Sequence, residues 1–220
     1  MTDYPDLVIF DCDGTLVDTE RISVRVNLRL LQEAGSDYTE ADIHEHLVGA
    51  SYETYLAKVE AHLGRPLEPD WIDRWGQEFR DACATELEAV DGVAEAIVEI
   101  LEAGSPICVA SNSAHDDINR NLEHTDLLRH FDGKIFSASD VAVGKPSPEL
   151  FLHAAASFGI DPSRCIVIED SPVGVAAARA AGMRVYAYAG GVITEERLVG
   201  PDTHVFHDMR ELPELIRRTW

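Results

Sequence analysis

The 220-residue sequence predicts an α/β fold built on a parallel sheet, with a helical insert after the first strand. Short apolar runs alternate with segments of helical periodicity, a pattern typical of chains with parallel sheets. One long stretch, residues 19–88, interrupts this alternation with helical patterns only. We therefore expect residues 1–18 and 89–220 to form the core that carries the sheet, and residues 19–88 to form a separate helical domain.

Six short apolar runs are the expected strands. They are rich in β-branched, aromatic and other apolar residues, and turn-forming residues lie between them. The expected strands cover residues 7–10, 106–110, 134–137, 165–168, 184–188 and 203–206.

Helices are expected between these strands, near residues 116–128, 148–158 and 173–181. Ser147 followed by Pro148 is a helix start signal, and Gly159 and Gly182 are stop signals. A further helix precedes the second strand. Its predicted apolar face consists of Val93, Ile97, Ile100 and Leu101.

The sequence pattern of the insert predicts three helices. One ends at Gly35, and the others cover residues 52–63 and 71–87. Trp71 and Trp75 are four residues apart and so share a helix face. We expect them to fill the insert's own core rather than to line a substrate pocket. The two crossings between the domains, at residues 17–20 and 87–92, are expected hinges.

The formal net charge of −22 argues against nucleic acid and anionic membranes as partners, because both require a basic surface. The acidic start does not resemble a signal peptide, and no apolar run approaches the roughly 20 residues of a membrane helix. We expect a cytoplasmic, monomeric protein. The four cysteines show no metal-binding spacing and are expected to be reduced thiols in the core.

Polar side chains follow four of the expected strands at their carboxyl ends. In a parallel sheet these ends share one edge, and open α/β sheets bind their ligands there. We therefore expect one crevice to collect these side chains. They are Asp11 and Asp13 after the first strand, Ser111 and Asn112 after the second, Lys145 beyond the third, and Glu169 and Asp170 after the fourth.

Four carboxylates in one place repel each other unless a cation lies among them. The available ligands are hard oxygens, which favour Mg²⁺ over zinc or copper. Mg²⁺ commonly bridges protein carboxylates and a substrate phosphate. Lys145 and Ser111 would bind the remaining phosphate oxygens, and Asn112 is placed with them as a phosphate-binding candidate. This local positive charge would offset the repulsion of an anionic substrate by the −22 chain.

Asp11 is the expected nucleophile, because an aspartate can attack phosphorus and form an aspartyl-phosphate. Asp13 projects to the same side if the segment is extended, so it can serve as general acid and base. Gly14 allows a sharp turn after the pair. A DxDG segment alone is weak evidence, since calcium-binding loops and turns look similar. The order of all four polar clusters, each at a strand end, makes the prediction specific.

The segments DCDGTLVD, VASNS, GKPSPE and VIEDSPVG resemble the four ordered motifs of the haloacid dehalogenase superfamily, over nearly the whole chain. The resemblance implies a Rossmann-like core with a small helical cap domain inserted after the first strand. It implies that Asp11 is the nucleophile, and that Asp13 is the acid and base and also binds Mg²⁺ through its backbone carbonyl. It also implies that Ser111 and Lys145 bind the substrate phosphate.

The same resemblance implies that Asp170 binds Mg²⁺ directly and that Glu169 does so directly or through water. Asp18 would order the loop and the hinge of the cap. The sequence is most similar to bacterial sugar-phosphate phosphatases of the 6-phosphogluconate type. We therefore expect a Mg²⁺-dependent phosphomonoester hydrolase that acts on a small phosphorylated metabolite, a sugar phosphate or phosphosugar acid, through an aspartyl-phosphate.

Other chemistries of the superfamily fit less well. Dehalogenases and phosphonate-cleaving relatives lack the residue equivalent to Asp13, and the latter also need a cap lysine, for which Lys58 is the only candidate. A β-phosphoglucomutase-type phosphosugar mutase remains an alternative. Two departures weaken it: Ser23 stands where mutases carry a histidine, and Tyr52, in the segment GASY, stands where they carry an arginine. A non-catalytic metabolite-binding protein is the third possibility.

Overall fold

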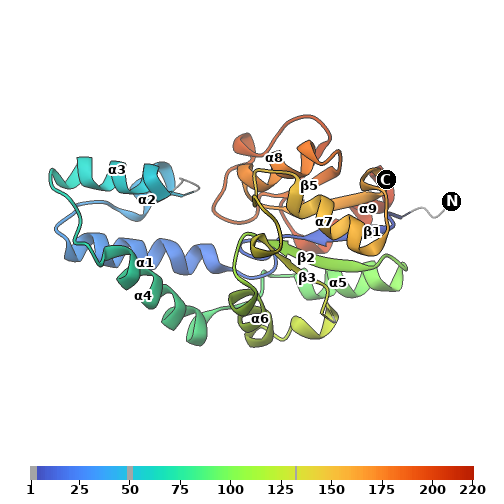
Figure 1. Ribbon diagram of the computed structural model, residues 1–220, viewed down its shortest axis with the longest axis horizontal. Coiled ribbons are helices and arrows are strands. Elements are labelled where there is room, and N and C mark those ends of the chain that lie inside the picture. The colour runs from blue at the N-terminus through green and yellow to red at the C-terminus, as the bar shows by residue number, and fades with distance from the viewer. Residues whose placement is uncertain (1–3, 49–51, 132) are drawn as a thin grey trace. The chain divides into compact units, whose positions relative to one another are not determined.

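The computed structural model describes residues 4–48, 52–131 and 133–220 of the chain (Figure 1). It divides into two compact units, one formed by Met1–Asp18 with Glu88–Trp220 and the other by Thr19–Leu87. The expected division at residues 19 and 88 differs from this one by a single residue. The segment GASY falls largely outside the described residues, which omit 49–51.

The first unit contains a sheet of six parallel strands in the order β3-β2-β1-β4-β5-β6. The predicted α/β fold is therefore confirmed. Strands β1, β5 and β6 have the predicted bounds. Strand β2 begins and ends one residue later than predicted, β3 begins one residue later, and β4 ends one residue later, so β2 and β4 reach the polar residues Ser111 and Glu169. The strands are β1 Leu7–Phe10, β2 Ile107–Ser111, β3 Ile135–Ser137, β4 Cys165–Glu169, β5 Arg184–Tyr188 and β6 Thr203–Phe206.

Strand β1 lies in the interior of the sheet, between β2 and β4. All four of its residues are fully buried, which explains the continuous apolar run LVIF. The strand order reverses direction at β1, so the chain leaves the carboxyl end of this strand at the switch point of the sheet. Crevices at such points are the usual ligand sites of open α/β sheets.

Helices cover the sheet. Helices α7 and α8 contact each other and the interior strands, whereas α5 packs against α9. In Figure 1, α5 and α7 lie on opposite sides of the strands. The helices of this unit are α5 Val93–Glu102, α6 His115–His124, α7 Glu149–Phe158, α8 Pro172–Ala180 and α9 Leu212–Thr219.

Some local expectations were wrong. Leu101 is 39% exposed, and Ala96 takes its place on the buried face of α5. Helix α6 ends at His124, and a separate 3₁₀ turn covers Leu128–His130. Pro148 rather than Ser147 occupies the N-cap position of α7. The Ser147 hydroxyl still accepts a hydrogen bond from the amide of Glu149 at 3.4 Å.

The second unit consists of the four helices α1 Thr19–Glu33, α2 Glu40–His46, α3 Tyr52–Leu63 and α4 Trp71–Glu86. The short helix α2 was not predicted; a capping box between Thr39 and Asp42 starts it. Helices α1 and α4 pack along each other. Surface ion pairs join them, and each contributes little to stability. These pairs are Arg25–Glu86, Arg29–Glu78 and Arg74–Glu33.

Trp71 and Trp75 differ in their surroundings. Trp71 is buried, and its indole N–H donates to the Tyr55 hydroxyl at 3.3 Å, which in turn donates to Asn27 Oδ1 at 2.9 Å. Trp75 stacks on Phe79 and lines a cavity of about 360 Å³ inside this unit. The expectation of a tryptophan core therefore fits Trp71 only.

The two crossings between the units run side by side within the first unit. The amide of Asp18 donates to the carbonyl of Glu88 at 2.9 Å, and Val17 forms an antiparallel bridge with Ala89. The four cysteines are all buried, and none of them forms a disulfide in the described chain. Among the described residues, none of the helices combines the length and apolarity needed to cross a membrane.

The neighbours Ile100 and Leu101 on α5 test the observed face of this helix. Ile100→Ala should lower the free energy of unfolding by roughly 2–4 kcal/mol, because it empties space in the core. Leu101→Ala should cost less than about 1 kcal/mol, because its side chain is partly in water. Urea unfolding of both variants measures the difference. Equal losses would place Leu101 in the core after all.

Candidate active site

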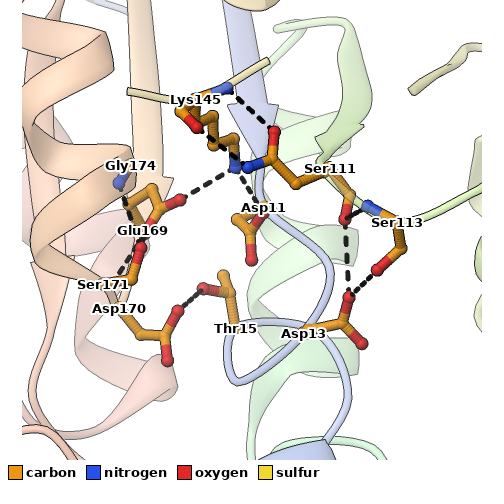
Figure 2. A network of polar contacts seen from close by, with 11 residues as sticks. Asp11, Asp13, Thr15, Ser111, Ser113, Lys145, Glu169, Asp170, Ser171 and Gly174 are labelled. Atoms are coloured by element: carbon orange, nitrogen blue, oxygen red, sulfur yellow. Dashed lines mark hydrogen bonds and ion pairs between the residues drawn. The ribbon is translucent and has the colours of Figure 1, made fainter. Parts of the chain in front are cut away.

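Side chains that follow β1, β2, β3 and β4 meet at the carboxyl edge of the sheet in the first unit (Figure 2). The amide of Asp11 donates to the carbonyl of Ile168 at 2.9 Å, which continues the β1–β4 ladder up to the first acidic residue. Ser111 and Glu169 are the last residues of their strands. The sheet itself therefore fixes the positions of three of the predicted site residues.

Lys145 lies at the centre of the cluster. Its ammonium forms ion pairs with Asp11 Oδ1 and, at 2.8 Å, with Glu169 Oε1, and it lies 4.8 Å from the centre of the Phe151 ring. Burial opposes its charge, but the two carboxylates outweigh burial and raise the pKa of Lys145. The lysine is therefore a fixed positive charge inside the site.

Asn112 supports this lysine. Its side-chain amide donates to the carbonyl of Lys145 at 3.1 Å and accepts from the amide of Lys145 at 2.9 Å. The sequence placed Asn112 among the phosphate-binding residues. The structure pairs both ends of its side chain with the backbone of Lys145, so the Asn112 side chain positions the lysine. The phosphate-binding role of Asn112 stays a prediction.

Both carboxylate oxygens of Glu169 accept hydrogen bonds from protein groups. Its Oε1 accepts from Lys145, and its Oε2 accepts from the amide and the hydroxyl of Ser171 at 2.7 and 2.9 Å. A Cβ on Gly174 would lie 1.6 Å from Oε1, so only glycine leaves room for this carboxylate. Glu169 was expected to bind a metal directly or through water. Each carboxylate oxygen has two lone-pair sites, and among the contacts of the described residues Oε1 accepts only from Lys145, so both modes stay compatible with this arrangement.

The carboxyl group of Asp11 has a raised pKa. Burial has the largest effect on its carboxyl group, Glu169 and Asp13 add repulsion, and Lys145 offsets only part of the sum, so that the pKa of Asp11 rises to about 7. A further positive charge is therefore needed to keep Asp11 fully ionised at neutral pH.

Two serines bind the side chain of Asp13. The Ser113 hydroxyl donates to Asp13 Oδ2 at 2.6 Å, and the Ser111 hydroxyl approaches the same oxygen at 3.4 Å (Figure 2). Sequence reasoning identified Ser111 but not Ser113. The sequence could have indicated Ser113, because it lies two residues after Ser111, on the other side of Asn112, in the turn that follows β2.

Asp170 lies against the loop that carries the DxDG segment. It accepts a hydrogen bond from the Thr15 hydroxyl at 3.3 Å, a contact that the sequence did not predict. Gly14 has a φ of +81°, and a Cβ at this position would lie 2.1 Å from Asp170 Oδ2. Both the backbone conformation and the close approach therefore require glycine.

The donor set fits a hard divalent cation. Four carboxylates, those of Asp11, Asp13, Glu169 and Asp170, gather at this edge of the sheet, and the ammonium of Lys145 pairs with the first and third of them. The described residues contain no cluster of three or more acidic, histidine or cysteine side chains arranged as metal ligands. A cation here would be held by few side chains, by backbone oxygen and by water or substrate. Mg²⁺ is bound in this way in many proteins.

Comparison with known proteins agrees with this arrangement. A family model described as haloacid dehalogenase-like hydrolase matches residues 8–188. The 6-phosphogluconate phosphatase of Escherichia coli is 30% identical over 98% of this chain and 96% of its own. A probable pseudouridine-5'-phosphatase of Drosophila melanogaster is 32% identical over 86% of this chain and 84% of its own.

A solved structure shares the fold closely. It is a haloacid dehalogenase-like protein of unknown function from Agrobacterium tumefaciens, 36% identical, with a TM-score of 0.89 over 97% of this chain and 98% of the other.

The raised pKa of Asp11 predicts a pH dependence of stability without a cation. Between its ordinary pKa and about 7, Asp11 holds a proton in the folded chain but not in the unfolded chain. The folded state therefore loses stability as pH rises through this range. In EDTA, the free energy of unfolding of the wild type minus that of Asp11→Asn should fall by about 1–2 kcal/mol from pH 5.5 to pH 8. A difference that grows with pH would show that Lys145 outweighs burial.

Proposed function

The chain belongs to the haloacid dehalogenase-like hydrolase family, and from this premise we propose that it is a magnesium-dependent phosphomonoester hydrolase that works through an aspartyl-phosphate. The observation that carries the proposal is the buried cluster in which Lys145 joins Asp11 and Glu169 while Asp13 and Asp170 lie close by. Such a cluster provides a nucleophile, an acid and base, and charges that bind phosphate.

In the first step Asp11 attacks the phosphorus atom of the substrate. Lys145 occupies Oδ1 of Asp11, so we assign the attack to Oδ2. A bond forms between this oxygen and phosphorus, the bond from phosphorus to the ester oxygen breaks, and Asp13 gives a proton to the leaving alcohol.

In the second step Asp13 takes a proton from water, and the resulting hydroxide attacks the phosphorus of the aspartyl-phosphate. Inorganic phosphate leaves and Asp11 is regenerated. Lys145 and the Ser111 hydroxyl bind the equatorial oxygens of the phosphoryl group in both steps, and such electrostatic stabilisation dominates phosphoryl transfer.

Asp11, Asp170 and the backbone carbonyl of Asp13 would hold Mg²⁺. The bound ion would supply positive charge to the phosphoryl oxygens and keep the Asp11 carboxylate ionised. Glu169, whose oxygens bind Lys145 and Ser171, would act on the ion directly or through water.

For the substrate we propose a small phosphorylated metabolite, a sugar phosphate or phosphosugar acid. The name of the Escherichia coli relative supports the second of these classes, and the name of the Drosophila relative adds a nucleoside monophosphate to the compounds worth assaying.

Phosphate release from a panel of sugar phosphates, phosphosugar acids and nucleoside monophosphates tests the proposal. The wild-type protein with Mg²⁺ should release stoichiometric phosphate from at least one of them. Asp11→Asn should lower kcat by at least about 10³-fold, because it removes the nucleophile. Interconversion of phosphosugar isomers with little free phosphate would establish a mutase instead. An Asp11→Asn protein as active as the wild type would refute the nucleophile.

Removal of the metal tests its proposed ligands. EDTA should abolish turnover and excess MgCl₂ should restore it. In thermal-unfolding titrations at constant ionic strength, MgCl₂ should raise the Tm of the wild type, because the ion binds the folded state. Asp170→Asn should weaken this binding by at least about 10-fold. The control Glu102→Gln, which removes one exposed negative charge from α5, should titrate like the wild type. If MgCl₂ raises the Tm of Asp170→Asn over the same concentration range as that of the wild type, Asp170 is excluded as a ligand.

A further inference from the structure

The carboxylate of Asp13 is held asymmetrically. The hydroxyls of Ser113, at 2.6 Å, and Ser111, at 3.4 Å, both approach the same oxygen, Oδ2. Figure 2 shows the two serines on one side of the carboxylate. The distances identify Ser113 as the stronger partner, because 2.6 Å lies in the range of a charge-assisted O–H···O⁻ bond whereas 3.4 Å lies beyond it.

Ser113 is itself held by two neighbouring strands. Its amide donates to the Ser111 hydroxyl at 3.1 Å, at the end of β2. Its carbonyl accepts from the Ser137 hydroxyl at 2.7 Å, at the end of β3. The Ser137 amide in turn donates to Asp140 at 2.8 Å. The hydroxyl of Ser113 is therefore presented from a turn whose backbone is fixed on both sides.

We infer that Ser113 is a positioning residue that fixes the carboxylate of Asp13 through Oδ2, so that Oδ1 is the oxygen that exchanges the proton with the leaving alcohol and with water. This inference rests on the acid and base role proposed for Asp13 above. It adds that one hydroxyl decides which of the two carboxylate oxygens carries that role. Ser113 acts through Asp13 and does not itself bind the phosphoryl group.

Leaving-group chemistry separates this role from direct binding of the substrate. An alkyl phosphate releases a basic alkoxide, which needs a proton from Asp13, whereas p-nitrophenyl phosphate releases a stable phenolate, which needs little help. A residue that orients Asp13 should therefore affect kcat/KM, which reports the first step, far more for the alkyl substrate than for the aryl one. Hydrolysis of the aspartyl-phosphate also uses Asp13 and is common to both substrates, so kcat does not make this separation. A residue that binds phosphate should affect both.

The experiment compares kcat/KM and kcat of five proteins and one control variant with two substrates, with Mg²⁺ present. The substrates are p-nitrophenyl phosphate and the alkyl phosphate that the wild type hydrolyses fastest in the panel above. The proteins are the wild type, Ser113→Ala, Ser113→Thr, Asp13→Asn and the double variant Asp13→Asn with Ser113→Ala. Ser157→Ala, on the exposed side of α7, serves as a control for the loss of a hydroxyl and should match the wild type.

Ser113→Ala should lower kcat/KM for the alkyl phosphate by roughly 10-fold and change kcat/KM for p-nitrophenyl phosphate less than about twofold. Ser113→Thr keeps the hydroxyl and should restore kcat/KM. The double variant should be no slower than Asp13→Asn, because Ser113 acts only through Asp13.

Other results would overturn the inference. An equal fall in kcat/KM for both substrates would make Ser113 a substrate contact, and unchanged kinetics would make it irrelevant to the reaction. Additive losses in the double variant would separate Ser113 from Asp13. If Asp13→Asn hydrolyses both substrates at the wild-type rate, the proposed acid and base role fails instead. A Tm of Ser113→Ala near that of the wild type shows that the comparison concerns folded protein.

Discussion

The buried ammonium of Lys145 is the constraint on which the site depends. It ties Asp11, at the end of β1, to Glu169, at the end of β4, and is itself held through its backbone by Asn112, which follows β2. Charges removed from water are tolerated only when their partners are well placed. The lysine, the asparagine and the two acids therefore form one unit, in which the loss of any member leaves another charge or backbone group without its partner.

This unit also explains why glycines occur next to the acidic residues. The acids lie so close to neighbouring backbone that a Cβ at Gly14 would overlap Asp170 and one at Gly174 would overlap Glu169. The DxDG and DSPVG segments thus combine two requirements, a carboxylate at a strand end and a backbone without a side chain beside it. Substituting either glycine would shift a carboxylate by far more than proton or phosphoryl transfer tolerates.

Much of this arrangement could be predicted from the sequence. Periodicity gave all six strands, because parallel strands buried on both faces are continuous apolar runs such as LVIF. The rule that strand ends share an edge brought the motifs together. Periodicity did not identify the exposed side of Leu101 or the seven-residue helix α2. The roles of Asn112, Ser113 and Thr15 depend on side-chain contacts between distant segments, and no local pattern encodes which atom of one turn faces which atom of another.

The electrostatics of the cluster couple the binding of cation and phosphate. One ammonium against four carboxylates leaves an excess of negative charge that, together with the −22 of the chain, opposes an anionic substrate. Burial and repulsion also favour protonation of Asp11, which removes the nucleophile. A divalent cation among these groups would relieve both effects at once. By linkage, phosphate bound at Lys145 and the cation would then strengthen each other's binding by the same factor. In the proposed reaction, the excess of acid would thus make the nucleophile depend on the cation that also binds the substrate.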